Sequence, residues 1–99
     1  MSKEVSEKVI EKKYLDVLDE VRDICKQIVT SKRSVYKDAW YDIPWRTLDH
    51  VIAYKARRMT RIPRKHLAKL VDDHIDIINL AVMALVQIKE EMGRLDYVR

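Results

Sequence analysis

The stretch PRKHLAKLVDDHIDIINLAVMALVQIKEEMG, residues 63–93, decides the fold. Its core-type positions are spaced alternately by four and three residues, which is the repeat along one face of a long α-helix. These positions are Leu67, Val71, His74, Ile78, Ala81, Leu85, Ile88 and Met92. Pro63 suits the first turn of such a helix, and Gly93 suits its C-cap. The pattern predicts a helix over residues 63–92 and a short tail, 93–99.

A second seam lies on the far side of the same helix, so its C-terminal half is apolar nearly all round. The members of this seam are Asp73, Asp76, Leu80, Met83 and Gln87. A helix of this kind must be covered on more than one face. A chain of 99 residues has room for one small core. We therefore predict a homodimer in which long helices pack across a two-fold axis.

Two more helices are expected before it. The spacing of Ile10, Tyr14, Val17, Val21, Ile24 and Ile28 predicts a helix over about residues 3–30. A connector, 31–46, follows and holds four of the seven aromatic residues. The next helix, 47–62, begins at Thr47 as N-cap and is stopped by Pro63. The predicted fold is all-α: a single helical domain, 1–99, whose three-helix protomer has two long helices and pairs into a homodimeric bundle.

The composition fits a folded helical protein rather than a disordered or membrane one. It is 47% hydrophobic and 36% charged, with one glycine. The longest apolar stretch, 77–88, is shorter than the about 20 residues of a membrane span. Because charge begins at Lys3, we expect no signal peptide and a cytosolic location, that of the host if the protein is viral. Abundant charge with scarce Asn and Gln is a balance often met in thermophile proteins.

Positive charge is concentrated in one segment of the chain. The net charge is +4, yet residues 50–71 contain seven Lys and Arg residues and no carboxylate. The cations around the predicted end of the second helix and start of the third are Arg57, Arg61, Arg64 and Lys65. A solvated corner, a phosphate site and a nucleic-acid site all remain open for these residues. The connector aromatics would be able to stack on bases.

Lys55 falls in the middle of the apolar stripe of the helix over residues 47–62. An ammonium group removed from water is costly unless an oxygen meets it. Three interpretations remain open: the side chain reaches solvent past its neighbours, it forms a buried ion pair, or it binds a substrate. The candidate acidic partners are Asp73 and Asp76.

Asp73 and Asp76 lie three residues apart on one helix, a spacing at which two carboxylates can share Mg²⁺. Magnesium is therefore the one cofactor to consider, with a solvated acidic face as the alternative for Asp72 and its neighbours. His74 has no second His or Cys at ligand spacing, which favours packing over metal binding. Cys25 is the single cysteine, so neither an intrachain disulfide nor a zinc cluster is expected.

Several short motifs together resemble the first family of nucleotide modification associated domains of phages and bacteria. They are Tyr36-Lys37-Asp38-Ala39-Trp40, Arg46, Lys55-Ala56-Arg57-Arg58-Met59, Asp72-Asp73-His74-Ile75-Asp76-Ile77-Ile78-Asn79 and Ala84-Leu85-Val86-Gln87. Members of that family typically show Asp-Tyr-Gly before the Trp, Lys-x-x-Arg on a helix, and an acidic stretch ending in Asn-Tyr. Here Val35 and Lys37 flank the Tyr, and Leu80 follows the Asn. The resemblance implies a nucleotide-related role in a phage or archaeal virus.

Asp73-x-x-Asp76, followed by an apolar helix, is also similar to the second metal motif of all-α MazG-type nucleotide pyrophosphohydrolases. Those enzymes carry Glu-Glu-x-x-Glu on the preceding helix, where this chain has Lys55-x-x-Arg58. Whether the protein is an enzyme stays open. An enzyme of this kind would release pyrophosphate or phosphate from nucleoside triphosphates with Mg²⁺.

These observations lead to one predicted site, which would bind a nucleotide or a phosphate group. Its substrate-binding residues are Tyr36, Trp40, Arg46, Lys55, Arg58 and Asn79, and Asp73 and Asp76 would bind metal or orient Lys55. The alternative function is a dimeric helical protein, not an enzyme, that binds nucleic acid or a protein partner through Arg57, Arg61, Arg64 and Lys65.

Overall fold

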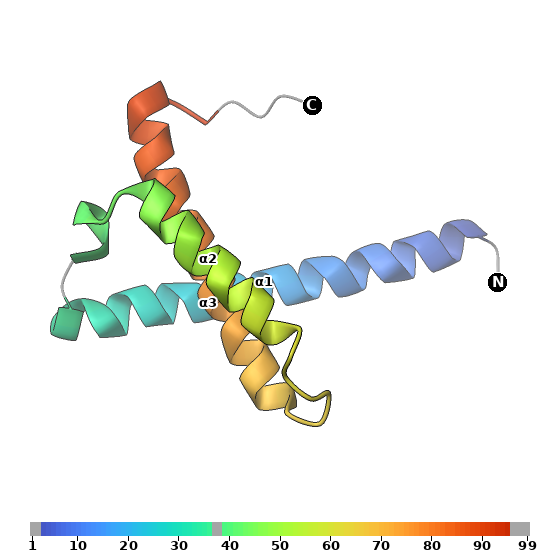
Figure 1. The fold of residues 1–99 in the computed structure, drawn as a ribbon. Helices are drawn as coiled ribbons and strands as arrows, with labels where there is room; N and C mark the ends of the chain where they lie inside the picture. Colours follow the sequence, from blue (N-terminus) through green and yellow to red (C-terminus); the bar gives the residue numbers. More distant parts are fainter. Residues whose placement is uncertain (1–2, 37–38, 96–99) are drawn as a thin grey trace. The chain divides into compact units, whose positions relative to one another are not determined.

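The computed structural model of the chain describes residues 3–36 and 39–95, with side chains for 6–31 and 39–95. The chain divides into two compact units, 1–35 and 36–99. The described residues form three α-helices and one short 3-10 helix, with no strand among them (Figure 1). The all-α prediction is therefore confirmed.

The first unit is formed by one long helix, α1, Lys3–Tyr36, whose last residue is assigned to the second unit. This helix continues six residues beyond the predicted end at residue 30. Residues 31–36 are polar, β-branched or aromatic and include neither Gly nor Pro, so nothing in them interrupts the backbone hydrogen bonds of a helix. The predicted start of the connector at residue 31 was therefore too early.

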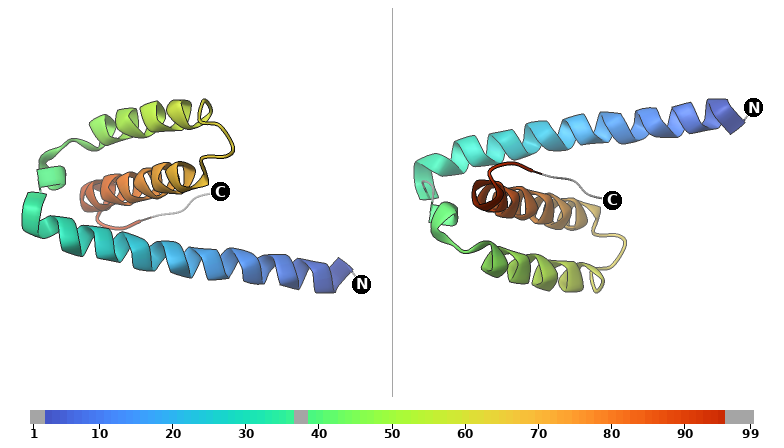
Figure 2. Two further views of the ribbon diagram at one scale, coloured as in Figure 1. Left: turned by 90° about the horizontal axis from the view of Figure 1, so that it is seen from below. Right: turned by 90° about the horizontal axis from the view of Figure 1, so that it is seen from above.

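The second unit is built on a helical hairpin. The 3-10 helix η1, Ala39–Asp42, leads into α2, Trp45–Met59, and α3, Leu67–Met92. Helices α2 and α3 lie side by side and run in opposite directions in both views of Figure 2. We refer to α2, α3 and the turn between them as the hairpin.

The boundaries of the hairpin helices differ from the predicted ones because of the two prolines. Pro44, rather than Thr47, is the N-cap of α2, and its carbonyl oxygen accepts the N–H of Thr47 at 2.9 Å. Pro63 lies in the turn over residues 60–66, where its carbonyl accepts the N–H of His66 at 3.0 Å. Helix α3 therefore starts at Leu67 instead of Pro63. Gly93 closes α3 with a φ of 82°, as the sequence predicts.

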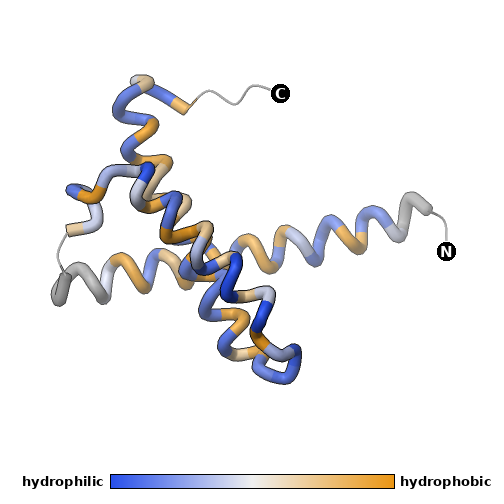
Figure 3. Tube along the Cα trace, in the orientation of Figure 1, coloured by the Kyte–Doolittle hydropathy of each residue, from blue (hydrophilic) through white to orange (hydrophobic). Residues whose placement is uncertain are grey.

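The hairpin holds the core. Among the described residues, the buried apolar side chains are Leu48 of α2 and Ile75 and Ala84 of α3. Apolar and polar residues alternate along all three helices (Figure 3). None of the described helices is both long enough and apolar enough to cross a membrane.

Candidate functional site

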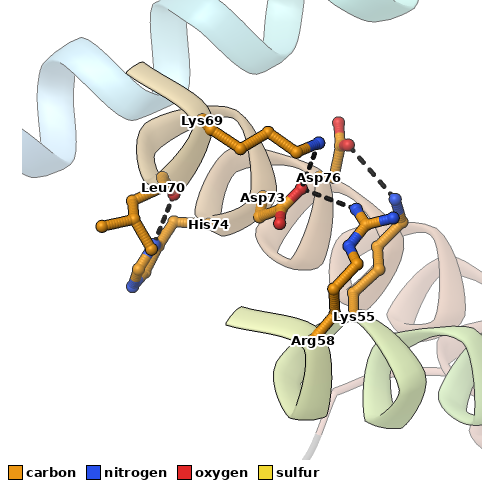
Figure 4. A network of polar contacts seen from close by, with 7 residues as sticks. All are labelled: Lys55, Arg58, Lys69, Leu70, Asp73, His74 and Asp76. Carbon is orange, nitrogen blue, oxygen red and sulfur yellow. Dashed lines mark hydrogen bonds and ion pairs between the residues drawn. The ribbon is translucent and has the colours of Figure 1, made fainter. Parts of the chain in front are cut away.

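Five charged side chains meet between α2 and α3, and we call them the polar cluster: Lys55, Arg58, Lys69, Asp73 and Asp76. Lys55 and Arg58 point from α2 toward the three residues of α3 (Figure 4). Spacings of three and four residues place side chains on the same face of a helix, so each helix offers its charges to the other. The cluster contains three cations and two carboxylates and carries one net positive charge.

Asp73 is the centre of the polar cluster and is fully buried, with 0% of its surface exposed. Its Oδ1 accepts hydrogen bonds from Arg58 Nη2 at 2.8 Å and from Lys69 Nζ at 3.1 Å. Asp73 Oδ2 and Arg58 Nε are buried without a hydrogen-bond partner. These two atoms are an acceptor and a donor in the same ion pair. A bidentate arginine–carboxylate pair, in which two N–H groups donate to the two oxygens, would use both of these atoms.

The charges of the cluster shift the protonation equilibria of its buried acid and its arginine. Burial by itself raises the pKa of Asp73, but hydrogen bonds from Arg58 and Lys69 and their positive charges outweigh it, so the pKa lies below its ordinary value. The hydrogen bond to Asp73 likewise raises the pKa of Arg58. Both groups are therefore charged near neutral pH.

The Lys55 side chain is partly buried and forms an ion pair, so it combines features of two of the interpretations that the sequence leaves open. Its side chain is 22% exposed, and its Nζ lies 3.3 Å from Asp76 Oδ2. The carbon stem is thus largely covered, while the amine meets one of the two acids expected for it. Asp76 itself is 43% exposed, so water screens this pair.

Both acids of the predicted magnesium site pair with cations in the structure, and Mg²⁺ binding by them stays a prediction. Asp73 Oδ1 already receives two cations, and Asp76 pairs with Lys55. A divalent cation would compete with these ammonium and guanidinium groups for the carboxylate oxygens, of which Asp73 Oδ2 has no hydrogen-bond partner. Within residues 3–36 and 39–95, no three His, Cys, Asp or Glu side chains come together in a way that would hold a metal ion. In the structure, Asp73 pairs with Arg58 and Lys69, and Asp76 pairs with Lys55.

The described aromatic residue of the predicted site, Trp40, lies in another part of the second unit, away from the polar cluster. Tyr41 of η1 donates its hydroxyl to Glu90, 2.7 Å from Oε1, and Gln87 Nε2 donates to the carbonyl of Ile43 at 2.6 Å. These bonds fix η1 beside the C-terminal part of α3. The Glu90 hydrogen bond and, next, burial raise the pKa of Tyr41.

The structure therefore does not bring Trp40 and Arg46 to the polar cluster. Trp40 belongs to η1, and its ring meets that of Tyr41 edge-on at 5.9 Å. The Arg46 guanidinium lies 4.7 Å from the Trp45 ring centroid. Arg46 precedes Lys55 on α2 by nine residues, which is about 13 Å along the helix. The Tyr36 side chain lies outside the described residues. Partly exposed Asn79 follows Asp76 by one turn of α3.

The remaining predicted cations form a separate exposed surface, which we call the basic corner: Arg57, Arg61, Arg64 and Lys65. All four side chains are exposed. Arg57 is in the last turn of α2, and the other three lie in the turn that leads to α3. Cations at the end of α2 also complement its helix dipole.

Sequence reasoning missed two residues at the site, Lys69 and Tyr54. Lys69 stands four residues before Asp73, and Tyr54 stands four residues before Arg58. The Arg58 guanidinium carbon lies 5.9 Å from the Tyr54 ring centroid, and Tyr54 is 65% exposed. The i, i+4 spacing, which is typical of interacting side chains on one helix, is the sequence signal that could have identified both residues.

The fold and the cluster define an all-α protein whose central charged site joins the two helices of a hairpin. The family model described as nucleotide modification associated domain 1 matches residues 32–88, which is more than half of the chain, and the chain belongs to that family. The match includes all of α2 and the whole polar cluster. No curated protein and no solved structure matches the chain.

Proposed function

We propose that the polar cluster binds a phosphate group of a nucleotide. The observation that carries this proposal is the excess of cations around Asp73 and Asp76. These cations use only some of their hydrogen-bond donors in the cluster. Arg58 remains 37% exposed and Lys69 52% exposed, although both pair with a fully buried carboxylate. A guanidinium has five N–H donors and an ammonium has three, so each retains donors for a phosphate oxygen.

Asp73 orients the two cations in this proposal. A buried carboxylate that holds Arg58 and Lys69 on one oxygen fixes their side chains before a ligand arrives. Donors fixed in advance lose less conformational freedom on binding than mobile ones. Lys55, which pairs with the partly exposed Asp76, supplies the third positive charge.

Tyr54 provides a surface for a base next to these donors. Its ring is largely exposed and lies beside the Arg58 guanidinium. Aromatic rings stack on all four bases, so Tyr54 would add affinity without selecting a particular nucleotide. The name of the family, which associates it with nucleotide modification, agrees with such a ligand.

The test is calorimetric titration of the full chain with AMP, ADP, ATP and inorganic pyrophosphate. Lys55→Gln should raise Kd about tenfold or more, because a hydrogen bond to a charged group contributes about 1.5–3 kcal/mol. Lys12→Gln is the matched control, since Lys12 also pairs with an aspartate, Asp16, at 2.9 Å, but on α1. The proposal would be refuted if none of these four compounds binds, or if the two variants have equal Kd values.

A second function, nucleic-acid binding through the basic corner, is favoured by one further observation. Four exposed cations follow one another at the turn between α2 and α3, in a stretch without any carboxylate. Phosphate contacts of this kind make affinity fall steeply with salt. Replacing both Arg61 and Arg64 with Gln should flatten the salt dependence of single-strand binding by about 1.4 units of slope. Replacing Lys12 and Arg22 with Gln on α1 is the control and should leave the slope unchanged.

A further inference from the structure

Helix α3 has an exposed apolar face that its packing against α2 does not use. Asp73 pairs with Arg58 of α2 and so marks the α2-facing side of α3, and Ala84, eleven residues or about three turns further on, lies on that same side. The four-three positions of α3 lie about a third of a turn around the helix from that side. We call them the outer seam: Leu67, Val71, His74, Ile78, Ala81, Leu85, Ile88 and Met92.

Within the second unit, most large side chains of the outer seam are exposed, whereas Ala81 and Ile88 are partly exposed. The exposed fractions of its large apolar side chains are 68% for Leu67, 56% for Val71, 38% for Ile78, 45% for Leu85 and 52% for Met92. Val82, which borders the seam, is 49% exposed. Contiguous apolar surface of this extent on a folded protein marks an interaction site.

We propose that the outer seam packs antiparallel against the outer seam of a second copy of this chain. A four-three repeat is the pattern by which two helices interlock, and it contains two alternating sets of positions. On α3, one set is Leu67, His74, Ala81 and Ile88, and the other is Val71, Ile78, Leu85 and Met92. In an antiparallel pair, each residue of one set faces a residue of the other set on the partner helix. The two-fold axis then passes between Ile78 and Ala81. Ala81 of each copy faces the larger Ile78 of the other, so the helices can approach closely at the centre.

The other pairs of residues that face each other across the two-fold axis also match in size and chemistry. Val71 meets Ile88, Leu67 meets Met92, and His74 meets Leu85 across the axis. His74 is the one polar member, and its Nδ1 lies 2.6 Å from the carbonyl oxygen of Leu70 on its own helix. The ring therefore enters the interface with one nitrogen already satisfied.

Charge selects the antiparallel orientation over the parallel one. The basic corner stands at the N-terminal end of α3, and a parallel pair would place two such corners side by side. The antiparallel pair separates them by the length of α3, which is 26 residues or about 39 Å. It also brings Glu91 of each copy to the end where the basic corner of the other copy lies, and it opposes the two helix dipoles.

The small core of the hairpin gives the dimer a thermodynamic reason. The hairpin buries few apolar side chains, and a unit of this size needs further burial to be stable. A stable interface removes about 800 Å² of surface from each partner, and a 26-residue helix with an apolar face is long enough to supply it. The polar cluster lies on the α2-facing side of α3, so dimerisation and phosphate binding can be tested separately.

Sedimentation equilibrium of the full chain tests the proposal. The unsubstituted chain should be a dimer at micromolar concentrations. Leu85→Glu should raise the dimer dissociation constant at least about hundredfold, because it buries an unpaired carboxylate in the seam. Val17→Glu, at a similarly exposed apolar position on α1, is the matched control and should remain a dimer. Circular dichroism establishes that each variant is helical.

A mixing experiment tests the pairing of residues across the two-fold axis. His74→Lys alone should also dissociate, since it places a second unpaired charge in the seam. Mixed with the Leu85→Glu chain, it should form a heterodimer, because the new lysine of one copy faces the new glutamate of the other. The proposal is refuted if the unsubstituted chain is a monomer, if Val17→Glu rather than Leu85→Glu abolishes the dimer, or if the two charged variants do not associate.

Discussion

Helix α1 and the hairpin respond differently to the same sequence pattern. Both α1 and α3 have apolar positions spaced by four and three residues, and both are long helices, of 34 and 26 residues. Yet every buried side chain among the described residues belongs to the hairpin. On α1, apolar residues such as Ile10, Tyr14 and Val17 are 65%, 67% and 56% exposed.

The polar interactions differ in the same way. On α1, the side-chain hydrogen bonds from Lys12 to Asp16 and from Thr30 to the Lys26 carbonyl join residues four apart. The second unit also has such local bonds, as in Lys69 to Asp73, but in addition it has bonds between different elements, as in Arg58 to Asp73 or Gln87 to Ile43. The comparison teaches that a four-three repeat predicts a helix, whereas charged pairs between helices indicate which helices pack together.

The largest expected effect comes from the core of the hairpin. Leu48 is 2% exposed, so Leu48→Ala should lower the free energy of unfolding by about 2–5 kcal/mol. Leu18→Ala on α1 removes the same atoms from a side chain that is 48% exposed and should cost less than about 1 kcal/mol. Urea denaturation of both variants measures the difference. Equal losses would mean that α1 is packed as tightly as the hairpin.

Charge removal should show the next largest contrast. Asp73→Asn weakens two ion pairs at a buried carboxylate and should lower the melting temperature by several degrees. Asp16→Asn removes the exposed partner of Lys12 on α1 and should leave the melting temperature nearly unchanged, as exposed pairs contribute little. Thermal melts monitored by circular dichroism provide the measurement. A smaller shift for Asp73→Asn than for Asp16→Asn would contradict the central role of the cluster.

The dependence of stability on pH should separate Asp73 from the other acids. Because folding lowers its pKa below the ordinary value of 3.8, its stabilising contribution is complete above that value and is lost as pH falls through the lower, folded value. The unsubstituted chain should therefore lose more stability in acid than Asp73→Asn does. Urea denaturation of both proteins from neutral pH down to strongly acidic pH tests this. Parallel pH curves would show that Asp73 is not held as a charged group.

The smallest effect is expected at the contact between η1 and α3. The hydrogen bond to Glu90 raises the pKa of Tyr41 above its ordinary value of 10.0. Glu90→Gln should lower the pKa of Tyr41 toward that value, because it removes a negative acceptor. Ring signals of Tyr41 in an NMR pH titration provide the readout, and Tyr14 of α1 serves as the reference tyrosine. An unchanged titration would indicate that η1 is not fixed by Glu90.

The sequence predicts the helices of this fold better than their ends. Periodicity identifies all three, and Gly93 marks the end of α3 correctly. The starts of α2 and α3 were misplaced by two and four residues, because Pro44 caps one helix and Pro63 forms a turn of its own before the other. Local composition allows a proline at several positions near a helix start, and the hydrogen bonds that select one of them depend on the folded backbone.

The charged part of the site was also more accessible to sequence reasoning than the aromatic part. Lys55 stood out because a cation within an apolar stripe needs an acid, and Asp76 provides it. Trp40 and Arg46 were grouped with it on the basis of resemblance, yet η1 is held at another part of α3 by Tyr41 and Gln87. The position of a short connector depends on a few distant hydrogen bonds, which have no periodic signature.

Those two bonds have a topological consequence. Because Tyr41 reaches Glu90 and Gln87 reaches the carbonyl of Ile43, the chain enters the hairpin unit close to where α3 ends. A short linker from Gly93 back to Ala39 would therefore close this unit into a ring. Opening that ring within the turn over 60–66 would give a circular permutant with the native helices, in which α3 precedes α2 and the new termini lie within the basic corner.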